Sequence, residues 1–191
     1  MEKVKLGPRL LAYPMPAFLV GANVEGKPNF ATVAWGGVVC GTPPLIAVSL
    51  RHYRYTYKGI KENGTFSINI PSTPQVIETD YCGIVSGTKT DKASVCGYSV
   101  YYGEVKTAPL ISECPVNMEC RVFQIDSLGS HALVIGEVVE CHITGECLTD
   151  GQPDVMKIDP FLYSDGGYLA FGRSLGRAFK IGRSLKNQGL R

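Results

Sequence analysis

Several familiar signatures are missing from this 191-residue sequence. No window approaches the ~18 apolar residues of a membrane span, and the opening residues, MEKVK, lack the apolar stretch of a secretory signal. Charge of one sign is not in excess, because 19 Lys and Arg stand against 17 Asp and Glu, and a nucleic-acid partner is therefore not indicated. We expect a cytoplasmic protein with no membrane span and no nucleic-acid partner.

The common nucleotide-binding motifs are absent as well. The chain has no GxxxxGK[ST] loop and no GxGxxG after an early strand, which argues against a P-loop or an NAD-binding Rossmann domain. None of the seven cysteines forms a Cys-x-x-Cys pair, and alternation in a strand would point Cys141 and His142 to opposite faces. We therefore predict no metal site. The odd cysteine count argues against a disulfide framework and favours reduced thiols.

Glycine and proline are abundant, with 22 Gly and 12 Pro, and they favour a β-rich body with many turns. Apolar patterning predicts strands over 17–23, 29–35, 45–50, 65–70, 116–126 and 131–143, the last two as an antiparallel hairpin. Helical patterning predicts helices over 55–63, 72–85 and 174–187. The order lacks βαβα alternation, so we predict one mainly β (α+β) domain over 1–191. It should be a closed or partly closed antiparallel barrel with peripheral helices and a helical C-terminal extension over 164–191.

Local signals refine these elements. Gly36-Gly37 predicts a bend or a close backbone approach, and residues 153–163 are interpreted as irregular. Thr56 is a candidate N-cap and Gly64 the end of the first helix. Ser72 and Gln75 resemble a capping box, and Asp91 is a candidate cap of a short turn.

Three polar clusters stand out from this background. Residues 29–37, NFATVAWGG, offer small side chains that let a flat ring approach the backbone; the alternative is a barrel strand with an ordinary core tryptophan. Residues 49–56, SLRHYRYT, place two arginines and two hydroxyls at a helix start, as suits a phosphate; the alternative is a solvated loop. Residues 86–92, SGTKTDK, form a second candidate anion cradle or a flexible loop. Their co-occurrence predicts a ligand with a flat ring and a phosphate.

Taken in order, four segments resemble the flavin-reductase-like, FMN-binding split-barrel family, and especially its flavoredoxin branch. They are NFATVAWGG, CGTPPLIAVSLR with RYTY, GTFSINIPS and DYCGIVSGTKTDK. The resemblance implies FMN held non-covalently near a homodimer interface. It implies ring contacts from Thr32, Ala34, Trp35, Asn69, Ile70 and Pro71, contacts to the ring and phosphate side from Ser49, Leu50, Arg51 and Thr56, and phosphate and ribityl contacts from Ser86, Gly87 and Lys92.

The flavin would carry the redox chemistry, so no catalytic triad is expected. Three functions follow: an FMN oxidoreductase reduced by NAD(P)H, an FMN electron carrier served by a redox protein such as a ferredoxin, or, from another class, a flavin-free binding module. Cys82 is a redox candidate, with an inert buried thiol as the alternative. His131 and His142 are interpreted as structural. The basic run from Arg173 to Arg191 predicts either a helix packed on the barrel or a docking surface for an acidic partner.

Overall fold

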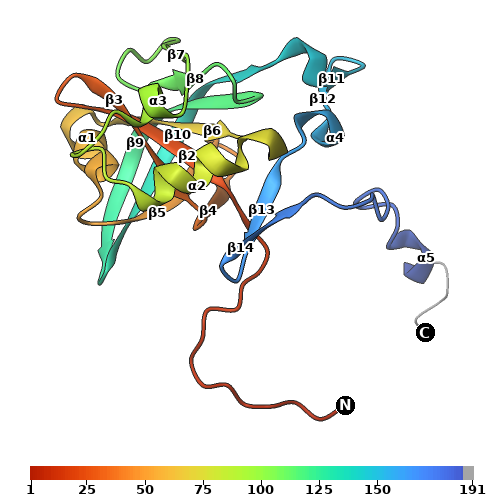
Figure 1. Cartoon of the computed structure of the whole chain (residues 1–191). Coiled ribbons are helices and arrows are strands. Elements are labelled where there is room, and N and C mark those ends of the chain that lie inside the picture. The colour runs from red at the N-terminus through yellow and green to blue at the C-terminus, as the bar shows by residue number, and fades with distance from the viewer. Residues whose placement is uncertain (187–191) are drawn as a thin grey trace.

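The computed structural model describes residues 1–186, and its centre is a seven-stranded antiparallel sheet (Figure 1). The strand order is β3-β2-β6-β9-β10-β5-β4. In chain order these strands are β2 (Phe18–Val24), β3 (Lys27–Val33), β4 (Gly36–Cys40), β5 (Leu45–Arg51), β6 (Thr65–Ile70), β9 (Val116–Leu128) and β10 (His131–Ile143). The predicted mainly β architecture with peripheral helices is confirmed.

The two edge strands of this sheet, β3 and β4, are neighbours in the chain. Only Ala34 and Trp35 separate them, so the sheet must curl until its two edges lie close together. The edges do not pair, and a 2.8 Å hydrogen bond from Ser49 N to Trp35 O joins the connecting segment to β5 instead. The result is a barrel that is split along the line between β3 and the β4–β5 pair.

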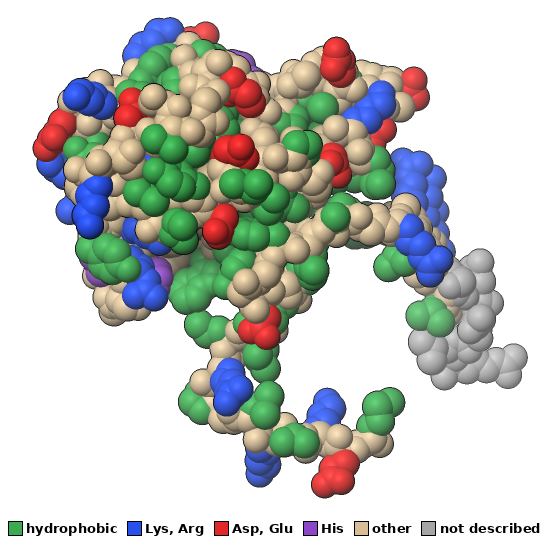
Figure 2. Space-filling model, viewed as in Figure 1, with side chains coloured by type: hydrophobic (Ala, Val, Ile, Leu, Met, Phe, Trp, Pro, Cys, Tyr) green, Lys and Arg blue, Asp and Glu red, His purple; other side chains and the backbone are tan. Residues whose placement is uncertain are grey.

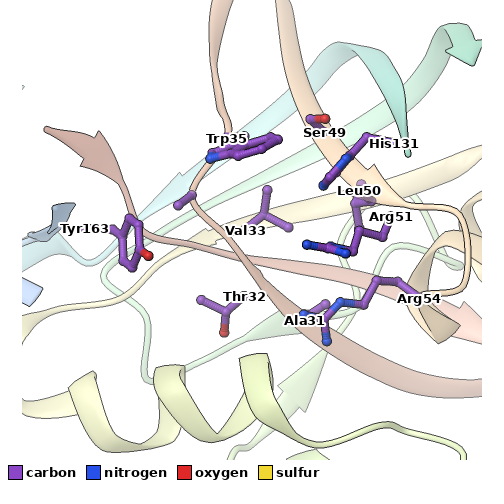
Figure 3. A pocket seen from close by; sticks show the side chains of 11 residues that line it. Ala31, Thr32, Val33, Trp35, Ser49, Leu50, Arg51, Arg54, His131 and Tyr163 are labelled. Atoms are coloured by element: carbon purple, nitrogen blue, oxygen red, sulfur yellow. The ribbon is translucent and has the colours of Figure 1, made fainter. Parts of the chain in front are cut away.

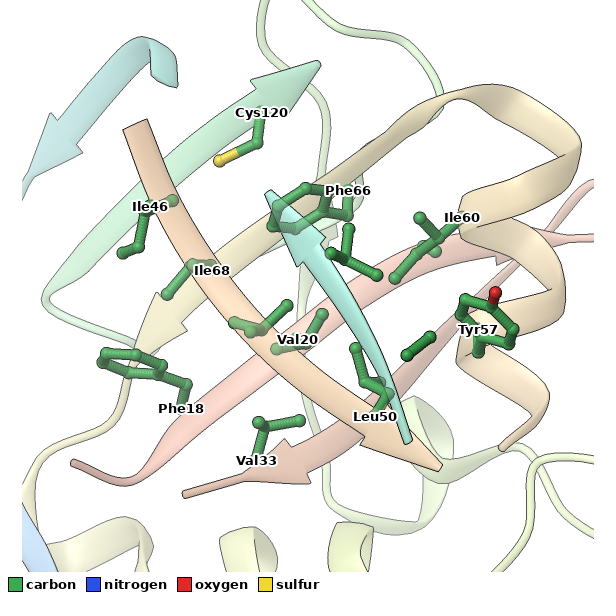
Figure 4. Packing of buried hydrophobic residues seen from close by; sticks show 14 residues of the cluster. Phe18, Val20, Val33, Ile46, Leu50, Tyr57, Ile60, Phe66, Ile68 and Cys120 are labelled. Carbon is green, nitrogen blue, oxygen red and sulfur yellow. The ribbon is translucent and has the colours of Figure 1, made fainter. Parts of the chain in front are cut away.

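The interior of the curled sheet is apolar. Val20, Ile46, Phe66 and Ile68 are almost fully buried and meet side chains from β10 and from helix α1 (Figure 4). Gly136 of β10 has a specific role here, because a Cβ at this position would collide with the Phe66 ring. Burial of such side chains stabilises the fold by about 1.5–3 kcal/mol each.

The opposite face of β6 and β9 is polar and holds a loop. Asn69 Nδ2 donates to Leu19 O, and its Oδ1 accepts from Ile111 N and from Asn117 Nδ2. Glu119, fully buried, accepts from the backbone N–H groups of residues 104 and 105. These bonds fasten residues 98–111, which contain the short hairpin β7 (Val100–Tyr101) and β8 (Leu110–Ile111).

Short helices surround the sheet, and several of them begin or end at the capping residues predicted from the sequence. The Ser72–Gln75 capping box is present, Asp91 accepts from Ser94 N, and Gly64 ends α1 in the left-handed conformation at φ 64°. None of the helices within residues 1–186 has the length and apolar character needed to cross a bilayer. The helices are α1 (Tyr55–Asn63), α2 (Val76–Ile84), α3 (Lys92–Val95), α4 (Val155–Ile158) and α5 (Arg183–Lys186), with 3-10 turns at Thr73–Gln75 and Gly145–Cys147.

A second, smaller sheet lies beside the split and was not expected from the sequence. It has the order β1 (Met15–Pro16), β13 (Phe161–Ser164) and β14 (Gly167–Ala170). The region 153–163 is thus not irregular, because it contains α4 and most of β13. A remaining two-stranded pair consists of β11 (Leu148–Thr149) and β12 (Gln152–Pro153).

Of the two alternatives at Gly36-Gly37, the structure shows the close backbone approach and not the bend. The pair opens strand β4, and Gly36 packs its backbone against Ala47 and the Phe18 ring, where no side chain fits. The helix predicted over 174–187 is reduced to α5 within the described residues; Asn187 lies outside them. Residues 171–182 are exposed, contact the barrel little, and project from the body like residues 1–12 (Figure 1).

Candidate functional site

A recess of about 290 Å³ opens along the split of the barrel (Figure 3). Its floor is the β3 segment that runs from Ala31 into the connection to β4. Because β3 is an edge strand of the sheet, its outward main-chain groups are not used by a neighbouring strand and can meet a ligand. The recess is lined by Ala31, Thr32, Val33, Ala34, Trp35, Ser49, Leu50, Arg51, Arg54, His131 and Tyr163.

Thr32 serves the floor in two ways. Its hydroxyl donates to Thr79 O of α2, which holds the helix against β3. Gly83, one turn further along α2, packs on the Thr32 side chain, where an added Cβ would lie 3.3 Å from Thr32 Cβ. The Thr32 hydroxyl is therefore committed to the protein, and the small residues around it keep the floor shallow.

An aromatic wall closes one end of the recess. The Trp35 ring, 40% exposed as a residue, lies 4.8 Å from the His131 ring at a tilt of 31°. His131 begins β10 directly opposite Arg51 of β5. Burial, with a contribution from the Arg51 charge, lowers the pKa of His131 below its ordinary value. At neutral pH this wall therefore presents an uncharged imidazole beside the indole.

Two arginines line the recess from the aromatic wall toward the N-terminus of α1 (Figure 3). Arg51 ends β5, and Arg54 is the N-cap residue of α1. Arg54 Nη1 donates to Gly83 O at 2.8 Å, so its guanidinium is fixed between α1 and the C-terminal end of α2. The five guanidinium donors leave others free for a ligand.

A second, smaller recess of about 60 Å³ lies next to the first, and the two share Ala31 and Arg54. It lies at the N-terminus of α1, where no side chain caps the helix and no acidic residue occupies the first turn. Unpaired N–H groups at a helix N-terminus favour an anion. This recess is lined by Asn29, Ala31, Tyr53, Arg54, Tyr55, Thr56, Val85, Ser86, Gly87 and Lys92.

Thr56 does not cap α1, contrary to the prediction. It lies within the first turn, is fully buried, and its hydroxyl accepts a 2.6 Å bond from Asn29 Nδ2. The carboxamide of Asn29 also explains why residue 87 is a glycine. A Cβ on Gly87 would collide with Asn29 Oδ1 and the Tyr55 ring. The backbone of Gly87 therefore approaches β3 as closely as only glycine permits.

Lys92 is a buried cation at the back of the smaller recess. Only 4% of the residue is exposed, and its ammonium donates to Phe30 O at 2.8 Å and to Cys82 O at 2.9 Å. An ammonium carries three donors, so one remains. Burial lowers the pKa of Lys92 to about 8, with a smaller contribution from the nearby charge of Arg54.

The structure gathers ten of the thirteen predicted cofactor residues. Six line the larger recess, namely Thr32, Ala34, Trp35, Ser49, Leu50 and Arg51, and four line the smaller one, namely Thr56, Ser86, Gly87 and Lys92. Asn69, Ile70 and Pro71 line neither, because Asn69 fastens the 98–111 loop and Ile70 packs on the core. Their contact with a flavin ring stays a prediction.

The side chains of Cys82 and His142, two further candidates from the sequence, lie outside both recesses. Cys82 faces a buried cluster with Leu19 and Phe30, and burial raises the pKa of its thiol well above the ordinary value. His142 is bonded to Glu119 on the polar face of the sheet. Within residues 1–186, no three His, Cys, Asp or Glu side chains gather in a way that would hold a metal ion.

Nine residues that line the two recesses were not predicted as cofactor contacts, among them Arg54, Asn29, His131 and Tyr163. Arg54 and Asn29 lie inside the quoted clusters but were not singled out. His131 was interpreted as structural, but it begins β10 opposite Arg51 and lines the larger recess. Tyr163 arrives from β13, and no local signal in the sequence connects it with β3.

The fold is an open antiparallel barrel with a recess along its split. The flavin reductase like domain matches residues 10–172, and the chain belongs to the flavin-reductase-like family. A flavoredoxin from Methanosarcina acetivorans is 41% identical with a TM-score of 0.93, covering 97% of this chain and 100% of that one. Flavoredoxin of Desulfovibrio vulgaris (Miyazaki F) is 40% identical with a TM-score of 0.89, covering 95% and 100%.

These two structures support the flavoredoxin branch and confirm the resemblance seen in the sequence. A more distant relative, the FMN reductase (NADH) RutF of Agrobacterium fabrum, is 28% identical over 126 residues, covering 63% of this chain and 67% of that one.

Proposed function

We propose that this protein binds FMN in the two recesses and passes electrons through it from a reduced donor to an acceptor. One observation carries the proposal: the two recesses are neighbours that share Ala31 and Arg54, and their linings differ in chemistry. Small residues of β3 and the Trp35 ring line one recess, and cations, hydroxyls and a helix N-terminus line the other. FMN has the matching arrangement, with a flat ring at one end and a charged phosphate at the other.

The donor set of the smaller recess suits a phosphate. A phosphate monoester carries a charge of about −1.5 to −2 at neutral pH and offers three acceptor oxygens. Arg54 and Lys92 provide the balancing charge, the Ser86 hydroxyl provides a donor, and α1 adds its N-terminal N–H groups. Arg54 is held by Gly83 O and Lys92 by Cys82 O. Because both side chains are already fixed, little of their conformational entropy would be lost when a phosphate binds.

The larger recess would take the isoalloxazine ring. Bound FMN would supply the redox chemistry. The protein's part is to support one face of the ring on β3, to flank it with Trp35 and Tyr163, and to place the Arg51 charge near its edge. A cation beside the pyrimidine edge of a flavin favours its reduced form, and the neutral His131 next to Trp35 is positioned to exchange a proton with a ligand in the recess.

Two versions of this function differ in how electrons arrive. In the oxidoreductase version, NADH or NADPH reduces the bound FMN, as the name of the FMN reductase relative suggests. In the carrier version, FMN stays bound and a redox protein such as a ferredoxin is the donor, as the likeness to flavoredoxins suggests. We place the enzyme first, with the carrier as the alternative.

We also propose a homodimer in the cytoplasm. Val38 and Val39 of β4 are 80% and 55% exposed and border an apolar groove of about 560 Å³ next to Trp35, a surface that a second copy would cover. Apolar side chains also gather over α2 and along the projecting terminal segments (Figure 2). The seven cysteines are free thiols, as a reducing compartment requires.

The absorption spectrum of the purified protein tests the proposal. Protein that is yellow as isolated, or becomes so on addition of FMN with a tight stoichiometric end point, supports it. Anaerobic mixing with NADH and with NADPH then separates the versions: bleaching of the visible flavin band supports the oxidoreductase. Bleaching by reduced ferredoxin alone supports the carrier, and a colourless protein that takes up no FMN refutes both.

A further inference from the structure

Two thiols lie in contact behind the smaller recess. Cys82 belongs to the last turn of α2, and Cys96 follows the end of α3. Their Sγ atoms are 3.9 Å apart, with Cys82 fully buried and Cys96 partly exposed. A disulfide has an S–S distance of about 2.05 Å, so the two sulfurs need to approach by less than about 2 Å to become bonded.

The segment between these cysteines belongs to the candidate site. Residues 83–95 supply Val85, Ser86, Gly87 and Lys92 to the smaller recess. The carbonyl of Cys82 itself accepts from Lys92 Nζ. A bond between residues 82 and 96 would therefore close a ring around the loop that we assign to the FMN phosphate.

We propose that Cys82 and Cys96 form an oxidisable dithiol whose disulfide locks the 83–95 loop. The part concerning FMN rests on the proposed function, whereas the disulfide and the locking of the loop do not. The oxidant class is a small disulfide such as oxidised glutathione, which reaches the partly exposed Cys96 first.

The reaction balances in two exchange steps. The Cys96 thiolate attacks one sulfur of oxidised glutathione, which forms a mixed disulfide and releases one glutathione thiolate. The Cys82 sulfur then attacks Cys96 Sγ, forms the Cys82–Cys96 bond and releases the second glutathione thiolate. The two protein thiols lose two protons and two electrons in total, and two glutathione molecules receive them.

The surroundings favour this order of attack. Burial raises the pKa of Cys96, but a hydrogen bond from the Cys82 thiol counteracts part of that rise, so Cys96 is the better nucleophile of the pair. Burial raises the pKa of Cys82 far more, and the Lys92 charge offsets only part of it. The third thiol of the cluster, Cys114, is fully enclosed and accepts a contact from Gln75 Nε2 instead.

Peptide mapping tests the pair directly, because lysines separate the two cysteines. Trypsin cleaves after Lys61, Lys89, Lys92 and Lys106, which puts Cys82 alone in peptide 62–89 and Cys96 alone in peptide 93–106. Folded protein is treated with oxidised glutathione, free thiols are alkylated, and the digest is analysed by mass spectrometry. We expect peptides 62–89 and 93–106 to be joined, and to separate after reduction.

Three variants make the result specific. Cys82→Ser and Cys96→Ser should each abolish the joined peptides, and Cys114→Ser should retain them. Either of two results overturns the proposal: Cys96 carries glutathione while Cys82 is alkylated, or Cys96 is joined to peptide 107–121, which contains Cys114 and Cys120. A far-UV spectrum of each variant confirms that it is folded before it is compared.

Amide hydrogen exchange tests the locking of the loop without any cofactor. Exchange over residues 83–95 should be slower in the disulfide form than in the reduced form, and equal exchange overturns the locking. When FMN is loaded, its release should also be slower from the disulfide form. If the protein forms the disulfide and exchange slows but no FMN is taken up, the proposed function is contradicted. The proposal of an oxidisable dithiol that locks the loop is still supported.

Discussion

Arg54 Nη1 donates a 2.8 Å hydrogen bond to Gly83 O and so joins the N-terminus of α1 to the last turn of α2. Arg54 is also one of the two residues shared by both recesses. A single side chain thus holds two elements together at the point where the proposed ring site meets the proposed phosphate site.

Replacing Arg54 should weaken FMN binding more than it disturbs the fold. We expect Arg54→Ala to weaken binding by roughly 1.5–3 kcal/mol, the usual range for a hydrogen bond to a charged group. At about 1.4 kcal/mol per tenfold change, this is at least a tenfold increase in Kd. Titration of the apo-protein with FMN measures it. Arg9→Ala, in the exposed N-terminal segment, is the control, and a Kd for Arg54→Ala within twofold of wild type would remove Arg54 from the site.

Lys92 should make FMN binding depend on pH in the alkaline range. Burial lowers its pKa to about 8, so in the apo-protein the ammonium loses its proton as the pH rises through that value. A bound phosphate dianion favours the charged form, and affinity should therefore be constant below pH 8 and fall above it. The phosphate itself remains a dianion in this range, since its second pKa is about 6.

The measurement is the FMN dissociation constant from about pH 7 to about pH 9.5, wild type against Lys92→Met. Methionine retains much of the side-chain volume and cannot titrate. The variant should bind more weakly at neutral pH and show a flat profile, with the two curves converging at the alkaline end. A wild-type profile as flat as that of the variant would show that the Lys92 charge does not act on the ligand.

Gly87 provides a steric test of the smaller recess. A Cβ at this position would collide with Asn29 Oδ1, so Gly87→Ala must push the 86–92 loop away from β3. We expect FMN affinity to fall at least as much as for the loss of one phosphate contact, about 1–3 kcal/mol. Gly41→Ala is the matched control, because a Cβ there meets nothing within 4 Å. Equal affinities of the two variants would place the ligand away from this loop.

Much of the fold could be predicted from local patterning, and the reasons are visible in particular residues. The β9–β10 hairpin, the β6 strand and the Ser72 capping box depend on neighbours in the chain, so alternation and cap residues indicate them. Strand β4 was missed because a Gly-Gly pair indicates a bend or a close backbone approach and not the start of a strand. In the structure, the lack of a side chain on Gly36 permits close packing at the sheet edge.

The candidate site was predictable where its residues are contiguous and not where they meet through space. Segments 29–37, 49–56 and 86–92 supply most of the lining, and each contains small residues, hydroxyls or cations at short spacing. Tyr163 depends on β13 pairing with β1, a contact between distant parts of the chain. Asn69 was assigned to the ring through the family resemblance, yet its carboxamide bonds to Ile111 N of the 98–111 loop and to Asn117.

The Glu119 carboxylate predicts a pH dependence of stability rather than of binding. Burial opposes its ionisation, but the bonds from His142 Nε2 at 2.7 Å and from two backbone N–H groups prevail and lower the pKa of Glu119. A group with a lowered folded pKa stabilises the fold above its unfolded pKa, about 4.3 for glutamate, and loses this contribution as the pH falls through the folded value.

Glu119→Gln should therefore lower the free energy of unfolding by about 2–4 kcal/mol at neutral pH, because an amide N–H would face donors that now meet a carboxylate. The difference from wild type should shrink as the pH falls below about 4.3, where the wild-type carboxyl takes up a proton. Denaturant unfolding at a series of pH values measures both quantities. Glu137→Gln, on the exposed side of β10, should behave as wild type. If the loss of stability in Glu119→Gln stayed the same down to acid pH, the buried charge would not be its cause, and the lost packing of the 98–111 loop would explain it instead.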